Sequence, residues 1–174
     1  MIHFQGWVYR AHNPYWSFDP LSGDGAKRHG GRFNPKGASA LYTSLTETAA
    51  LAEYHQGFPH RPQPATLCTY EVDCLDVTDL TNPEERGALG IDSDDLSSPW
   101  EMLAGEGRVP PSWALSKRLI EDGVAGIIVP SYAKNAPENG KNLVFWVWDS
   151  VVPHKVIVID DFHRLPKNKD SWRE

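Results

Sequence analysis

Cysteine is scarce in this sequence, which has only Cys68 and Cys74 among its 174 residues. The two lie in TLCTYEVDC, a segment with the composition of a β-strand, where a separation of six residues spans about 20 Å at roughly 3.3 Å per residue. A disulfide needs Cα atoms closer than about 7 Å, so we expect none between these two residues. The sequence therefore predicts two reduced thiols, as in a cytoplasmic protein.

Long hydrophobic runs are also absent. Runs such as Leu143–Trp148 (LVFWVW) extend over about six residues, whereas a membrane-spanning helix needs about 20. The amino-terminal stretch MIHFQGWVYRAHN lacks the basic and apolar regions of a secretory signal peptide. These absences predict a cytoplasmic location and no membrane partner.

Basic residues are too few for a surface that binds nucleic acid. Lys and Arg total 17 against 23 Asp and Glu, which gives a net charge of −6 and an isoelectric point near 5.6. Binding to phosphate backbones depends on a positively charged face, so we expect no direct nucleic-acid partner. One local basic cluster fits a small anion better than a duplex, and it comprises Lys27, Arg28, Arg32 and Lys36.

Motifs for metal ions and nucleotides are missing as well. The seven histidines are scattered, without an HExxH sequence or another common ligand spacing, so we expect no metal ion. The stretch GRFNPKGAS is not a Walker A loop, because its lysine precedes the glycine and no strand leads through it into a helix. GDGAKRHGG lacks the flanking elements of a dinucleotide fingerprint.

What the sequence contains predicts a single α+β domain over residues 1–174. The length fits one hydrophobic core, and 40% hydrophobic with 23% charged residues is typical of a globular protein. We expect a core of about residues 5–160 and a frayed or docking tail at 165–174. Short strands are predicted at 5–10, 31–34, 38–43, 66–72, 76–80, 125–130, 143–148 and 155–160.

Two helices and two long irregular segments complete this prediction. A helix at 111–122 has a proline near its start and a glycine after its end. Another helix follows residue 44. Residues 12–30, rich in Pro, Ser, Asp and Gly, are expected to form a long loop, and residues 81–109 contain short helical pieces at best.

The helix after residue 44 has a recognisable start. Ser44 and Glu47, in SLTE, fit a capping box in which each side chain bonds a free backbone N–H. The helix continues through ALAEY and is expected to stop at Gly57 and Pro59. Glu53 lies on a face of small residues that would pack against a sheet. It is therefore a half-buried or cleft-lining carboxylate, or else a glutamate at the rim of an amphipathic helix.

Arg32 stands in the stretch GGRFNPKGASALYTS, where two glycines precede it and an Asn-Pro pair follows. Proline stiffens the backbone here, which favours an arginine presented to an anion at fixed geometry. Arg10 ends the first predicted strand, and Ser131 follows AGIIVP, a strand of the buried type. Strand ends often present polar side chains to ligands. The alternatives are a surface arginine at position 10 and a turn serine at position 131.

Taken together, these stretches resemble the RES domain family, named for its arginine, glutamate and serine. The resemblance rests on WVYR with Arg10, GGRFNPKGASALYTS with Arg32 and Tyr42, ALAEY with Glu53, and GIIVPS with Ser131. The stretch NLVFW, which begins at Asn142, also fits. The resemblance covers nearly the whole chain, from about residue 5 to residue 160.

RES proteins are toxins of type II toxin–antitoxin systems, so the resemblance implies a bacterial toxin with NAD+ as its substrate. It implies a fold similar to that of the ADP-ribosyltransferases, with short strands in two packed sheets. The implied partner is an Xre-like antitoxin, which forms a hetero-oligomeric complex and blocks the cleft with its C-terminal region.

Three functions are consistent with this resemblance. The first is degradation of NAD+ by hydrolysis or phosphorolysis of the nicotinamide–ribose bond. The second is ADP-ribosylation of a protein target such as phosphoribosyl pyrophosphate synthetase. The third, a catalytically inactive binding module, is disfavoured because the arginine, glutamate and serine are all present.

The resemblance also implies roles for individual residues. Glu53 would stabilise the oxocarbenium-like charge that develops on the ribose as the bond to nicotinamide breaks. Arg10 and Arg32 would hold phosphate or ribose oxygens through planar, bidentate guanidinium groups. Tyr42 would stack on the nicotinamide or its ribose. The implied catalytic residues are Glu53, Arg10 and Ser131, and the implied NAD+-binding residues are Arg10, Arg32, Tyr42, Glu53, Ser131 and Asn142.

Overall fold

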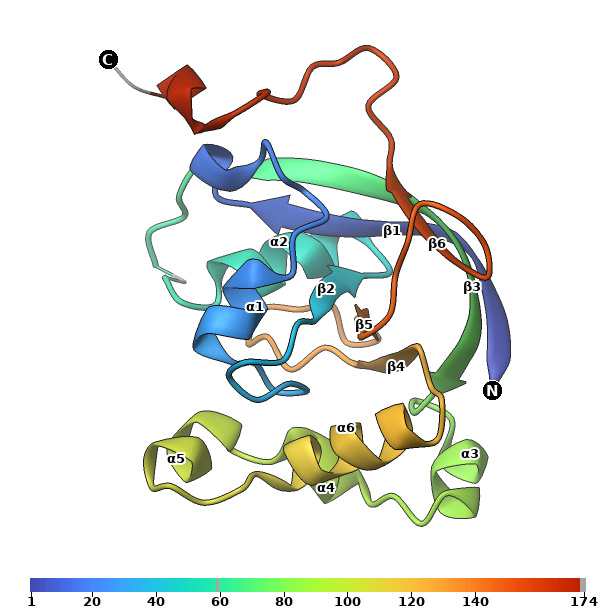
Figure 1. The fold of residues 1–174 in the computed structure, drawn as a ribbon. Coiled ribbons are helices and arrows are strands. Elements are labelled where there is room, and N and C mark those ends of the chain that lie inside the picture. Colours follow the sequence, from blue (N-terminus) through green and yellow to red (C-terminus); the bar gives the residue numbers. More distant parts are fainter. Residues whose placement is uncertain (59, 173–174) are drawn as a thin grey trace.

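The protein is described by a computed structural model that covers residues 1–58 and 60–172, and it consists of one closed β-sheet with short helices around it (Figure 1). The strands are β1 (Ile2–His12), β2 (Leu41–Ser44), β3 (Thr66–Asp79), β4 (Gly126–Pro130), β5 (Lys141–Phe145) and β6 (His154–Val158). Their order is β1-β2-β5-β4-β3-β6, and an additional pairing of β1 with β3 closes five of them into a barrel. The prediction of a single α+β domain is confirmed.

The two packed sheets expected from the sequence are replaced by this single sheet. The reason is the length of β3, whose 14 residues pair with β1 along one edge. The other edge of β3 pairs with β6 from Tyr70 to Cys74 and with β4 from Val77 to Asp79. Because one strand has three partners, the sheet curves round on itself instead of dividing in two.

Several predicted strands are shifted or resized by a few residues, such as β1 at Ile2–His12 and β5 at Lys141–Phe145, and two predictions differ more. The strands expected at 66–72 and 76–80 are continuous as β3, and Asp76 lies within it in a left-handed conformation with φ of 60°. Aspartate is one of the few residues that adopt this conformation readily. The strand expected at 31–34 is instead a tight turn closed by an isolated bridge between Gly31 and Asn34.

The helices are α1 (Asp24–His29), α2 (Glu47–His55), α3 (Pro83–Ala88), α4 (Ser93–Ser97), α5 (Trp100–Gly105) and α6 (Pro111–Glu121), with 3-10 turns η1 (Pro14–Trp16) and η2 (Lys169–Trp172). α6 confirms the helix predicted at 111–122. The segment 81–109 holds α3, α4 and α5, and the expected loop 12–30 contains η1 and α1. α2 ends just before Gly57, as predicted, while Pro59 lies outside the described residues. None of the described helices is long and apolar enough to cross a bilayer.

The start of α2 differs from the predicted capping box. Thr46 is the N-cap residue, and its hydroxyl accepts a hydrogen bond from the Ala49 N–H at 3.2 Å. Glu47 is therefore the first helical residue, where a reciprocal bond to Ser44 does not form. Ser44 instead ends β2, because β2 pairs with β5 up to that position. The side chain of Ser44 is thus placed beside β5.

Two hydrophobic cores follow from the alternation of side chains along the strands. One face of the sheet points into the barrel and buries, among others, Val8, Leu41, Tyr70, Leu143 and Phe145. The other face of β4 and β5 packs against α4 and α6, and its members include Leu96, Leu115, Leu119, Ile127, Val129 and Val144. The second core holds the layer of α3 to α6 beside β4, at the bottom of Figure 1.

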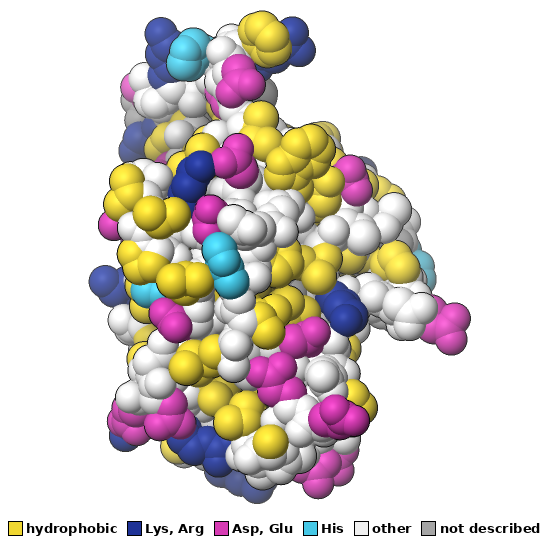
Figure 2. Space-filling view, turned by 90° about the vertical axis from the view of Figure 1, so that its right-hand side faces the viewer, with side chains coloured by type: hydrophobic (Ala, Val, Ile, Leu, Met, Phe, Trp, Pro, Cys, Tyr) yellow, Lys and Arg dark blue, Asp and Glu magenta, His cyan; other side chains and the backbone are white. Residues whose placement is uncertain are grey.

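The cysteines match their prediction as thiols outside a disulfide. Cys68 and Cys74 are buried free thiols on β3. The segment after β6 returns across the barrel, and η2 docks against η1 (Figure 1). On the face shown in Figure 2, charged side chains of both signs are interspersed with hydrophobic ones. The described residues of this face therefore form no continuous basic surface.

Candidate active site

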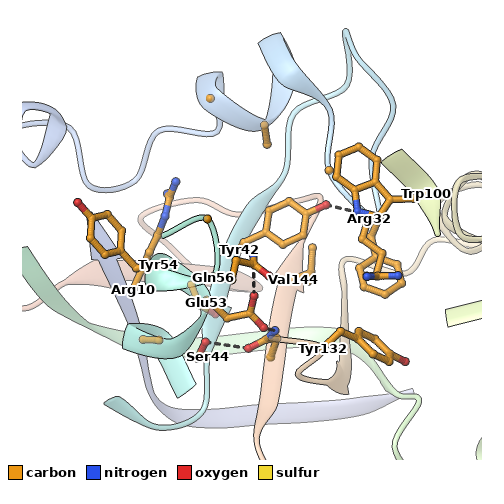
Figure 3. Close-up of a pocket in the computed structure, with 18 of the residues that line it drawn as sticks. Arg10, Arg32, Tyr42, Ser44, Glu53, Tyr54, Gln56, Trp100, Tyr132 and Val144 are labelled. Atoms are coloured by element: carbon orange, nitrogen blue, oxygen red, sulfur yellow. Dashed lines mark hydrogen bonds between the residues drawn. The ribbon is translucent and has the colours of Figure 1, made fainter. Parts of the chain in front are cut away.

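A cavity of about 970 Å³ opens beside the barrel (Figure 3). Its walls come from β1, β2, β5, α2, the turn at 31–34 and α5, and its volume is typical of small-molecule sites. Five of the six site residues expected from the sequence line it, namely Arg10, Arg32, Tyr42, Glu53 and Asn142. The sixth, Ser131, is not among the lining residues but contacts one of them.

Glu53 presents a fixed carboxylate to this cavity. Its Oε1 accepts hydrogen bonds from Ser131 Oγ and from Asn142 Nδ2, each at 2.5 Å. Its Oε2 accepts a longer bond from Gln56 Nε2 at 3.3 Å. α2 positions Glu53 because its small residues Ala49, Ala50 and Ala52 are buried, which lets the helix approach the sheet closely. The side chain is therefore a partnered carboxylate in a cleft and not an unpaired glutamate at a helix rim.

The amide of Asn142 is itself oriented by Ser44. Ser44 Oγ donates to Asn142 Oδ1 at 2.7 Å, and the two residues are opposite each other in the pairing of β2 with β5. This bond directs the Nδ2 group of Asn142 toward Glu53. The sequence did not identify Ser44 as a site residue, because its place before a helix indicated a cap. Only the pairing of residues 38–44 with residues 141–145, which a single sequence does not give, would have identified Ser44.

Ser131 donates a hydrogen bond to the Glu53 carboxylate without itself lining the cavity. It follows β4 directly, and its hydroxyl donates to Glu53 while the Ala133 N–H approaches Ser131 Oγ at 3.4 Å. Since Ser131 does not line the cavity, this position suits orientation of Glu53 better than contact with a ligand.

Arg10 is placed by β1 and held by the loop that follows it. Its Nη1 donates to the Ser22 carbonyl at 3.1 Å. Burial lowers the pKa of the Arg10 guanidinium below its ordinary value. Beside it, His12 Nε2 lies 2.7 Å from Tyr70 Oη, and Tyr70 donates to the Pro20 carbonyl at 2.7 Å. These bonds tie the loop, and through it Arg10, to the barrel.

The buried His12 makes stability depend on pH. Burial, and to a smaller degree the charge of Arg10, lowers the pKa of His12 from 6.5 to about 3. Between these values the unfolded state binds a proton that the folded state does not, so stability falls as the pH drops from 6.5 toward 3. The His12→Gln variant is expected to reduce the slope of unfolding free energy against pH by up to ~1.4 kcal/mol per pH unit in this window.

Urea unfolding at several pH values tests this expectation, with His29→Gln on the exposed end of α1 as the matched control. An unchanged slope in folded His12→Gln would mean that the buried imidazole does not govern acid stability.

Arg32 sits at the tip of the turn between Gly31 and Asn34. The turn is closed by Gly31 N–H to the Asn34 carbonyl at 2.9 Å and by Asn34 N–H to the Gly31 carbonyl at 3.3 Å. A side chain at Gly31 would collide with Tyr42, since a Cβ there would lie 2.4 Å from Tyr42 Oη. Gly30 has φ of 74°, in the left-handed region that favours glycine. Both glycines are therefore required by the turn that presents Arg32.

The guanidinium of Arg32 already has protein partners. Its Nη1 donates to the Ser98 carbonyl at 2.6 Å and lies 3.4 Å from the Leu96 carbonyl, at the end of α4. The guanidinium carbon lies 4.6 Å from the centroid of the Tyr132 ring, a cation–π contact. Burial lowers the pKa of Arg32. Arg32 thus links the 31–34 turn to the α4–α5 segment as well as facing the cavity.

Tyr42 is fixed by two hydrogen bonds at the same turn. Its hydroxyl accepts from the Phe33 N–H at 2.9 Å and donates to Asn34 Oδ1 at 2.7 Å. Burial raises the pKa of the Tyr42 phenol. With its hydroxyl engaged in the protein, Tyr42 offers the cavity its ring rather than a polar group.

α5 contributes a wall that the sequence did not predict. Trp100, Glu101 and Met102 all line the cavity, and they belong to the segment 81–109, where the sequence predicted short helical pieces at best and no site residue. Tyr54, Gln56 and Tyr132 line it too. No local motif marks these residues, and only the folding of α4 to α6 onto β4 and β5 brings α5 to the site.

The charged side chains that line the cavity lie around the Glu53 carboxylate. Among the described lining residues, the cations are Arg10 and Arg32 and the carboxylates are Glu53 and Glu101. In Figure 3, Arg10 and Arg32 lie on either side of Glu53. The described residues contain no group of three His, Cys, Asp or Glu side chains that could hold a metal ion. Such a site suits a ligand with anionic groups whose reaction generates positive charge next to Glu53.

Comparisons with known proteins agree on one family. The sequence model of the RES domain matches residues 8–168. The chain is 31% identical over 127 residues to the NAD(+) phosphorylase MbcT of Mycobacterium bovis and of Mycobacterium tuberculosis, which covers 66% of this chain and 67% of each relative. The crystal structure of the M. tuberculosis MbcT–MbcA toxin–antitoxin complex is similar, with a TM-score of 0.68, 25% identity, and coverage of 91% of this chain and 84% of that one.

Proposed function

Because this chain belongs to the RES domain family, we propose that it is a toxin that cleaves the nicotinamide–ribose bond of NAD+ and transfers the ADP-ribosyl group to phosphate. The observation that carries this proposal is the Glu53 carboxylate, held at the cavity by Ser131 and Asn142. The name of the MbcT relatives, NAD(+) phosphorylase, supports phosphate over water as the acceptor.

The chemistry assigned to Glu53 is stabilisation of a cation. As the bond between C1′ of the ribose and the nicotinamide nitrogen breaks, nicotinamide leaves with the electron pair as a neutral molecule. Positive charge builds on the ribose, and a phosphate oxygen then forms the new bond at C1′. A carboxylate fixed beside C1′ stabilises this charge more than it stabilises the substrate, which lowers the barrier. The leaving group needs no proton, so the site requires no general acid.

The other site residues bind or orient. Arg10 and Arg32 would hold phosphate or ribose oxygens, since guanidinium groups match these anions in planar geometry. Ser131 and Asn142 would fix the rotamer of Glu53, and Ser44 would fix Asn142. Tyr42 would give the nicotinamide ribose a flat surface. We also propose kinship with the ADP-ribosyltransferase fold, which the shared NAD+ substrate and a carboxylate beside the sheet support.

Incubation of the purified chain with NAD+ labelled in the adenylate half tests this function. The expected result is phosphate-dependent formation of ADP-ribose 1″-phosphate with release of nicotinamide. Free ADP-ribose as the only product would establish hydrolysis instead. Label that appears on a protein only when cell extract is added would establish ADP-ribosylation, for example of phosphoribosyl pyrophosphate synthetase. Intact NAD+ under all conditions would leave an inactive binding module.

We further propose an Xre-like antitoxin as partner and the cytoplasm as the site of action. The similarity to MbcT bound to MbcA supports an antitoxin, and the open cavity provides a place for its C-terminal region to block. Expression of the chain alone is expected to arrest growth. Co-expression with the antitoxin encoded beside it should restore growth and yield a stable complex on size exclusion, with NAD+ consumption suppressed. A wild-type chain that is monomeric, abundant and harmless on its own would contradict this expectation.

A further inference from the structure

Arg32 and Trp100 lie together on one side of Glu53, and Arg10 lies on the other side (Figure 3). In NAD+ the pyrophosphate joins the reacting ribose to the adenosine, so a pyrophosphate held by Arg32 brings the adenosine to this side of the cavity. We propose that Trp100 forms the adenine-binding wall of this site and thereby determines selectivity for a dinucleotide; the inference rests on the proposed function.

Trp100 is tied to the same turn that presents Arg32. Arg32 donates to the Ser98 carbonyl just before α5, which fixes the start of the helix relative to the turn. Trp113 of α6 lies behind Trp100, with ring centroids 6.3 Å apart and planes inclined by 40°. Trp113 Nε1 donates to the Gly31 carbonyl at 2.8 Å, which fixes this tryptophan to the turn too. A pyrophosphate on Arg32 would therefore place the adjoining adenosine beside Trp100.

The other aromatic residues of the cavity are less suited to stack on a base. The ring of Tyr132 is already covered by the guanidinium of Arg32. Tyr54 makes edge contacts with His55 and Phe58, at centroid distances of 5.1 and 5.5 Å, and its hydroxyl donates to the Pro64 carbonyl. Trp100 is half-buried and combines the largest ring with a place on the Arg32 side of the cavity. Stacking on an aromatic ring binds bases without requiring hydrogen bonds to their edges.

Kinetics with two substrates test the proposal. Nicotinamide mononucleotide carries the same scissile bond as NAD+ but lacks the adenylate half. Trp100→Ala is expected to lower kcat/KM for NAD+ by roughly 5- to 100-fold, the range for losing one base–aromatic stack. The same variant should leave kcat/KM for nicotinamide mononucleotide unchanged. Trp100→Phe, which keeps a ring, should restore most of the activity with NAD+, and Trp7→Ala on the outer face of β1, where Trp7 is 62% exposed, is the matched control.

Three kinetic outcomes would overturn the inference. One is an equal loss of activity with both substrates in Trp100→Ala. Another is a wild-type chain that uses nicotinamide mononucleotide as well as it uses NAD+. The third is a selective loss in Tyr54→Ala with Trp100→Ala unaffected, which would place the adenine beside Arg10 instead.

Calorimetric titration with ADP-ribose separates failure of this inference from failure of the proposed function. Trp100→Ala is expected to weaken ADP-ribose binding by the same factor as it lowers kcat/KM for NAD+, whether or not the chain turns NAD+ over. Weakened binding without any NAD+ turnover in the wild type would reject the proposed reaction and keep the adenine site. Turnover of NAD+ with equal ADP-ribose affinity in wild type and Trp100→Ala would reject the adenine site alone.

Discussion

Replacing Glu53 by glutamine is expected to reduce kcat for NAD+ cleavage by about 10²–10³-fold, the usual effect of removing one group that stabilises transition-state charge. Glutamine has the size of glutamate and keeps an oxygen that can accept from Ser131 and Asn142, so the fold and the cavity should persist. What is lost is the negative charge beside the developing cation. Because that charge forms only in the transition state, KM should change much less than kcat.

Nicotinamide release from NAD+ measures this effect directly. The matched control is Glu121→Gln, at the exposed end of α6 and not among the lining residues of the cavity, which should retain wild-type kcat. Expressed without antitoxin, Glu53→Gln should also no longer arrest growth. A folded Glu53→Gln chain with wild-type turnover and toxicity would remove Glu53 from the mechanism.

Replacing Arg32 by lysine is expected to lower kcat/KM for NAD+ by about tenfold to a hundredfold, although the charge is kept. Lysine lacks the planar fork, and losing one charge-assisted hydrogen bond costs roughly 1.5–3 kcal/mol, or about one to two decades. The structure adds a second reason for the loss. Arg32 Nη1 bonds the Ser98 carbonyl and its guanidinium covers Tyr132, so an ammonium group in its place would not hold α5 in the same way.

Arg28→Lys is the matched control, since Arg28 is exposed in the last turn of α1 and does not line the cavity. It should leave kcat/KM unchanged. The same result for Arg32→Lys would show that the Gly30–Asn34 turn presents only a loop charge, and that the pyrophosphate is bound elsewhere.

The sequence predicted those elements whose bounds depend on interactions between residues a few positions apart. α6 and β4 were predicted close to their observed bounds, because proline, glycine and runs of β-branched residues act within a few positions. Glu53 was singled out by a helix face of small residues, and the described structure places its carboxylate in the cavity. The constrained backbone around Arg32 was also anticipated from its flanking glycines and Asn-Pro pair.

The rest of the site depends on contacts between distant segments, which a single sequence does not reveal. Ser44 was assigned to a helix cap, yet the register of β2 with β5 places it on Asn142, 98 positions away. The partners of Arg32 lie 64 and 66 positions along the chain, in a segment without any motif. Trp100 reaches the cavity only because α4 and α6 pack on the outer face of the barrel. Closure of the sheet likewise depends on β3 and its three partner strands, whereas the sequence predicted two separate strands at 66–72 and 76–80.

The rate of nicotinamide release from NAD+ as a function of phosphate concentration, measured on the purified chain freed of any antitoxin, tests the central claim most directly. The account predicts saturable activation by phosphate, with nicotinamide and ADP-ribose 1″-phosphate formed in equal amounts and the rates of both lowered together by about 10²–10³-fold in Glu53→Gln. A folded, antitoxin-free chain that leaves NAD+ intact at every phosphate concentration would contradict it.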